Sequence, residues 1–145
     1  AVLDDARSAA AERVEAEYVK AKSCLATSRR AEAMTLLEKL SKDVSGKYGA
    51  EAAYMLIMDS YDRGEFESVE TKVYAFADAG SDQTYWLAKS FIVLGDSFME
   101  RDEVEQARAT FESVRDGYVP CGDEDDVLDN VRMRLVRIDE MAQKE

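Results

Sequence analysis

The chain has 145 residues, a formal net charge of −12 at pH 7 and no histidine. This length fits one domain of ordinary size. An acidic surface repels nucleic-acid phosphates and anionic lipid headgroups, so neither is a favoured partner, although much of the charge can simply keep a domain dissolved. Without histidine the chain lacks an imidazole acid–base catalyst, a histidine-activated nucleophile and a histidine-containing zinc site.

Helical periodicity extends along almost the whole sequence. Apolar residues make up 46% of the chain, strong helix formers are plentiful and there is one proline, a composition that favours an all-α fold. Apolar residues recur at steps of three and four, which places them on one face of each helix. The pattern predicts helices over residues 3–25, 33–40, 53–61, 66–76, 86–98, 104–114 and 127–141. Breaks are expected at 28–32, 45–47, 62–65, 79–82 and 117–123.

Several residues at or between these breaks allow local predictions. Gly64 is expected in the left-handed conformation that ends a helix, and Ser81 or Asp82 is expected to cap the next helix. Gly95 lies within a helical pattern and is interpreted as a residue of close helix packing. The acidic run 123–126 lacks the alternating ligands and central glycine of a calcium loop. It is therefore interpreted as a cap and first-turn acids of the last helix.

Six apolar columns repeat along the chain at steps of about 36 residues. The aligned sets are Tyr18, Tyr54 and Phe91; Ala21, Ile57 and Leu94; Leu25, Tyr61 and Phe98; Ala33, Val69 and Ala107; Leu37, Val73 and Phe111; and Leu40, Phe76 and Val114. Each repeat is predicted to form a helical hairpin, which by itself cannot bury both faces of its helices. Stacking the hairpins buries those faces, which predicts a solenoid.

These columns resemble the tetratricopeptide repeat family. The third repeat is most similar. It has Phe91, Leu94, Gly95, Phe98, Ala107, Phe111 and Val114 at the family's positions, and Pro120 lies one residue after the position of the family's proline. Lys22 and Met58 stand where the family prefers a small residue, which predicts looser packing in the first two hairpins.

The resemblance implies a right-handed superhelix of about three antiparallel helix pairs plus a C-terminal capping helix. The expected repeats cover about 12–46, 47–80 and 82–120, with the capping helix at about 124–143, in a single domain of residues 1–145. The chain also resembles the C-terminal end of long bacterial proteins with many such repeats, so we expect a fragment of a larger scaffold.

In this family the first helix of each pair lines a concave groove. The resemblance implies a partner groove lined by Val19, Ser23, Ala26, Met55, Asp59, Asp62, Lys89, Ile92, Asp96 and Met99. Because these residues mix apolar groups with acids, we expect a protein or peptide partner with basic and apolar side chains. The family's carboxylate clamp is not expected, since the corresponding positions hold Val19, Ser23, Leu56, Lys89 and Val93, with a single lysine.

The sequence therefore predicts a protein–protein interaction scaffold module that is not an enzyme. A structural spacer or terminal cap of a longer solenoid, with no ligand of its own, is the main alternative, and an enzyme is a distant one. Self-association through exposed solenoid ends is a further expectation. The compartment is not indicated: a fragment of an exported bacterial protein would lie in the periplasm or at the outer membrane, and any other in the cytoplasm.

No cofactor, metal or membrane insertion is expected. The chain lacks a phosphate-binding glycine loop and a run of about 18 apolar residues. Its two cysteines, Cys24 and Cys121, do not have metal-binding spacing. Cys24 lies within a helical pattern, where a buried thiol is common, and Cys121 lies in an expected loop.

Overall fold

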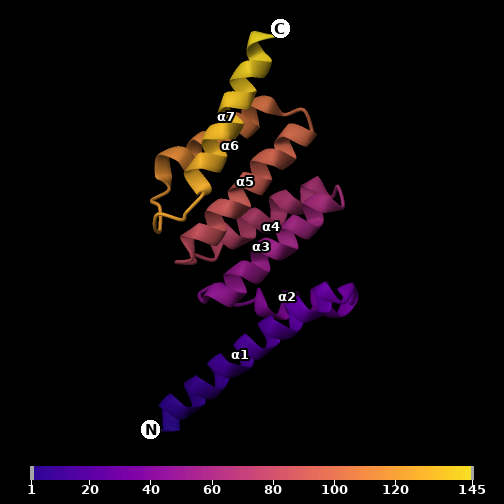
Figure 1. Cartoon of the computed structure of the whole chain (residues 1–145), viewed down its shortest axis with the longest axis vertical. Coiled ribbons are helices and arrows are strands. Elements are labelled where there is room, and N and C mark those ends of the chain that lie inside the picture. The colour runs from indigo at the N-terminus through magenta and orange to yellow at the C-terminus, as the bar shows by residue number, and fades with distance from the viewer. Residues whose placement is uncertain (1, 145) are drawn as a thin grey trace. The chain divides into compact units, whose positions relative to one another are not determined.

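The structure is a computed structural model that describes residues 2–144, with the side chains of residues 6–144. Within these residues the chain forms seven helices and no strand (Figure 1), which confirms the predicted all-α class. The helices are α1 (Val2–Ala26), α2 (Arg30–Leu40), α3 (Lys47–Asp62), α4 (Phe66–Asp78), α5 (Thr84–Glu100), α6 (Val104–Gly117) and α7 (Val127–Gln143).

Each helix occupies a predicted helical segment, but the third begins well before residue 53. It begins at Lys47 because small residues allow close packing there, and Gly49, Ala50 and Ala52 are all buried. A Cβ atom at Gly49 would lie 1.8 Å from the backbone oxygen of Asp43. Glycine is therefore required where α3 begins against the loop that precedes it.

The chain divides into two compact units, residues 1–56 (unit 1) and 57–145 (unit 2), with the boundary inside α3. This division does not test the prediction that residues 1–145 form a single domain.

Unit 1 is built on the antiparallel pair α1 and α2. Its buried core contains Ala21, Leu37, Leu40 and Ala52, and Tyr18, Met34, Leu36, Met55 and Leu56 pack against it. Cys24 is buried, as predicted. Because α1 has 25 residues and α2 has 11, α1 extends beyond its partner (Figure 1), and residues 6–16 are all exposed.

Unit 2 is centred on α5, which packs against α4, α6 and α7. Gly64 has a φ of 74°, which confirms the left-handed residue between α3 and α4. Gly95 on α5 is buried, and a Cβ atom there would lie 2.3 Å from Cε1 of Phe111 on α6. The prediction of close helix packing at Gly95 is therefore confirmed, because a Cβ atom there would overlap the ring of Phe111.

Burial follows four of the six predicted columns throughout. The sets beginning with Ala21, Ala33, Leu37 and Leu40 are buried at every member. The first column is half-buried at Tyr18, Tyr54 and Phe91. The third column differs, since Leu25 is 36% exposed whereas Phe98 is 5% exposed.

The start of α5 differs from the expected cap. The helix begins at Thr84, and neither Ser81 nor Asp82 is its N-cap residue, which is Gln83. The Ser81 hydroxyl oxygen accepts a hydrogen bond from the Gln83 N–H at 3.0 Å. Ser81 therefore stabilises a turn before the helix, as serine does in many loops.

Candidate interaction surfaces

The predicted groove residues on α1 lie open to solvent. Val19 is 58% exposed, and Ser23 and Ala26 are also exposed. Met55 on α3 is half-buried because it packs against the core of unit 1. The α1 part of the predicted surface is thus accessible within its unit.

The predicted groove residues on α5 face α7 and the segment before it. The Nζ of Lys89 lies 3.5 Å from a carboxylate oxygen of Asp126, and Ile92 is 5% exposed. Both carboxylate oxygens of Asp96 accept hydrogen bonds from Arg134 on α7, at 2.7 and 2.9 Å from Nε and Nη2. Such two-point pairing of arginine and carboxylate fixes both distance and orientation. Two of the predicted groove residues on α5, Lys89 and Asp96, therefore already pair with α7 or the residue before it.

The remaining predicted acids lie at the end of α3 in unit 2. Asp59 is half-buried, with a carboxylate oxygen 3.8 Å from the guanidinium of Arg63, and Asp62 is exposed. Only Asp62 of this pair presents an exposed carboxylate.

A cavity of about 200 Å³ lies beside the contact between Asp96 and Arg134. Its lining includes Met99 and Tyr61, and the Tyr61 hydroxyl donates to a carboxylate oxygen of Glu100 at 3.4 Å. Burial and then the negative charges of Asp96 and Glu100 raise the pKa of Tyr61. Its phenol therefore stays protonated at neutral pH and acts as a hydrogen-bond donor.

The loop before α7 is organised around Asp125. Its carboxylate accepts hydrogen bonds from the Tyr118 hydroxyl, the Cys121 N–H at 2.9 Å and the Val127 N–H at 2.9 Å. Burial alone would raise the pKa of Asp125, but these hydrogen bonds outweigh it, so the pKa is lowered. Burial, followed by the bond to Asp125, raises the pKa of Tyr118.

This geometry corrects part of the prediction for residues 123–126. The N-cap residue of α7 is Asp126, which lies in this run as predicted but makes no side-chain capping hydrogen bond, whereas Asp125 accepts a hydrogen bond from the N–H of Val127. The other acids of the run precede the helix, and the acid in its first turn is Asp129. Among the side chains that the structure describes, no group of three histidine, cysteine, aspartate or glutamate residues could hold a metal ion.

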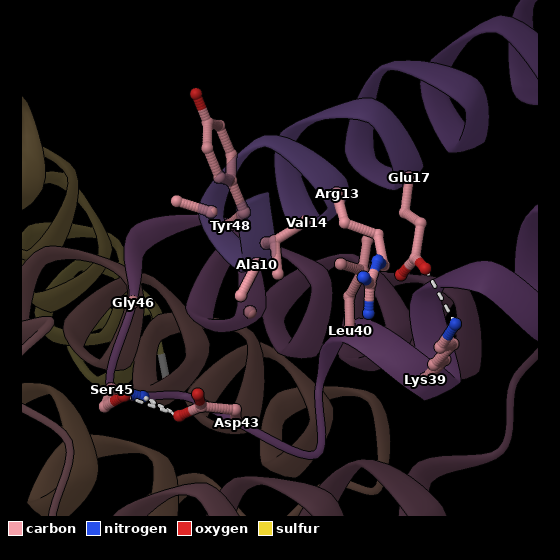
Figure 2. A pocket seen from close by; sticks show the side chains of 12 residues that line it. Ala10, Arg13, Val14, Glu17, Lys39, Leu40, Asp43, Ser45, Gly46 and Tyr48 are labelled. Carbon is pink, nitrogen blue, oxygen red and sulfur yellow. Dashed lines mark hydrogen bonds and ion pairs between the residues drawn. The ribbon is translucent and has the colours of Figure 1, made fainter. Parts of the chain in front are cut away.

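Unit 1 contains a hollow of about 500 Å³ that the sequence did not indicate (Figure 2), here named the α1 hollow. Its apolar lining comprises Ala10, Ala11 and Val14 of α1, Leu40 of α2 and Tyr48 of α3. Its polar lining comprises Arg13, Glu17, Lys39, Asp43 and Ser45. The hollow forms because the apolar stripe of α1 continues past the end of α2 and meets the loop after α2 and the first residues of α3. The difference in helix length was its only sequence signal.

Comparison with known proteins gives no relative for this chain: no family model, curated protein or solved structure matches it. Among the described residues, no helix combines the length and apolar character needed to cross a bilayer.

Proposed function

We propose that this chain is a protein-interaction module built from tetratricopeptide-like helix pairs in a right-handed superhelix. Support comes from burial that repeats at equivalent positions of three helix pairs, as expected when hairpins stack. The close approach of Gly95 to Phe111 adds support, because the small residue lets α5 and α6 come together as the family pattern requires.

The outer face of α1 is the observation that carries the binding function. Glu12, Glu15, Val19, Ser23 and Ala26 follow one another at steps of three and four, so they share one side of the helix. All five are exposed, and no basic side chain among the described residues pairs with Glu12 or Glu15. A strongly exposed valine beside two uncompensated carboxylates suits a partner with apolar and basic side chains.

The contact between α5 and α7 favours a second function, that of a terminal cap. The predicted groove residues on α5 are less available than those on α1. Asp96 accepts hydrogen bonds from Arg134, and Ile92 is buried. We propose that α7 closes the helix stack, so that unit 2 acts as a cap while unit 1 carries the binding surface.

Two labelled helical peptides test the binding function. They share leucines at every third and fourth position and differ only in lysine or glutamate at the flanking positions. Fluorescence anisotropy should show saturable binding of the lysine peptide. Val19→Asp should increase its Kd about tenfold or more, because the substitution places a charge in an apolar contact.

Val119 is the matched control, because it is a valine that is 77% exposed in unit 2. Val119→Asp adds the same charge and should leave the Kd unchanged. Equal affinity of the lysine peptide for both variants and the wild type would reject the outer face of α1 as its binding site.

A further inference from the structure

The α1 hollow lies on the side of α1 that faces the core of unit 1, roughly opposite the outer face that carries Val19. We propose that this hollow docks a second kind of partner segment, one with an apolar side chain next to a carboxylate. This site is separate from the outer face of α1 and does not depend on the function proposed for it.

The apolar part of the hollow supplies the contact area. Val14 remains 39% exposed although it lies on the same stripe as the buried Ala21, because α2 ends before reaching it. Leu40 and the ring of Tyr48 complete the apolar lining. A volume of about 500 Å³ lies within the range of sites that accept side chains of a ligand or peptide. Filling the hollow would remove this apolar surface from water, which favours binding.

The charges around the hollow determine which partner fits. Glu17 already accepts a hydrogen bond from the Lys39 ammonium at 2.7 Å. Asp43 accepts hydrogen bonds from the Ser45 hydroxyl at 2.5 Å and the Ser45 N–H at 3.1 Å, and these bonds lower the pKa of Asp43. Both acids of the lining therefore already accept hydrogen bonds from residues of this chain.

Arg13 is the remaining charged residue of the lining. Its guanidinium points from α1 toward the hollow (Figure 2), and no carboxylate among the described residues pairs with it. An incoming carboxylate would meet a planar donor that can bind it at two points. A basic segment would be less favoured, because Glu17 and Asp43 already accept hydrogen bonds within the chain.

The glutamate and lysine peptides described above also test this site, with the full-length chain as the target. The glutamate peptide should bind the wild type saturably. Arg13→Glu should weaken that binding about tenfold or more, because the change replaces an attractive charge with a repulsive one. Lys42→Glu is the matched control, since Lys42 is exposed near the hollow without lining it. It should change the Kd by less than about twofold, as expected for a screened surface charge.

Ala11→Trp supplies an independent variant, because its side chain would fill the hollow from an exposed helix position. It should abolish binding of the glutamate peptide and leave binding of the lysine peptide to the outer face intact. Conversely, Val19→Asp should affect only the lysine peptide, so failure of one site is distinguishable from failure of the other.

Three outcomes would overturn the proposal. The first is no saturable binding of the glutamate peptide, and the second is equal weakening by Arg13→Glu and Lys42→Glu. The third is a wild-type dimer in sedimentation that Ala11→Trp dissociates, which would assign the hollow to a second copy of this chain.

Discussion

The contact between Gly95 and Phe111 allows a quantitative test of how α5 and α6 pack. In Gly95→Ala the new methyl carbon would lie 2.3, 2.5 and 2.9 Å from three ring carbons of Phe111. Carbon atoms normally approach to about 3.5–4.0 Å, so the ring must retreat by about 1 Å or more. Phe111 is 0% exposed, so the ring cannot relieve the overlap by swinging into solvent.

Two opposing terms set the expected loss of stability. Overpacking a filled core costs about 1–3 kcal/mol. Replacing a helical glycine by alanine contributes about 0.5–1 kcal/mol in the other direction, because alanine loses less backbone entropy on folding. The overlap is large, and the ring can shift only toward the cavity of about 200 Å³ that Phe111 also lines, so we expect a net loss of about 1–2 kcal/mol. That loss corresponds to a fall in Tm of about 2–8 °C for a chain of this size.

Urea and thermal unfolding followed by circular dichroism measure this loss. Gly117→Ala is the control, because Gly117 is the last residue of α6 and a methyl group there has no atom within 4 Å. It should not lower the Tm. In a Phe111→Leu background the cost of Gly95→Ala should largely disappear, since the clashing ring carbons are gone. A Gly95→Ala protein as stable as the wild type would refute the inferred packing.

The two remaining predictions concern the start of α3 and the loop before α7. Gly49→Ala should lower the Tm, because a methyl group there would lie 1.8 Å from a backbone oxygen, whereas Gly46→Ala, with open space, should not; equal Tm values would contradict this. Asp125 has a lowered folded-state pKa, so its contribution to stability is present above the unfolded value of 3.8 and is lost as pH falls through the folded value. Thermal unfolding from about pH 5 to pH 2 should therefore show a steeper loss for wild type than for Asp125→Asn, and parallel curves would exclude the proposed hydrogen bonding.

Local sequence patterns were sufficient for the helices and for most of the buried positions. The apolar periodicity identified all seven helices, and the columns of Ala33 and Leu37 are buried in each pair. These features depend on which side of a helix a residue occupies, and that follows from a spacing of 3.6 residues per turn. The local role of Gly95 was recognised for the same reason, since it lies on the buried side of its helix.

The surfaces available to a partner could not be assigned in this way. Val19 and Ile92 were predicted to line one groove, yet Val19 is 58% exposed and Ile92 is 5% exposed. Periodicity says which residues share a face but not which other segment covers that face.

The sequence by itself determined the helices, their buried sides and the acidic character of the chain, because each follows from residue type and short-range spacing. Only the tertiary structure decided that Arg134 reaches Asp96, and that the α1 hollow lies beside Arg13 where α1 extends beyond α2. Both features join residues far apart in the chain. They depend on the lengths and directions in which whole helices meet, which no local pattern encodes.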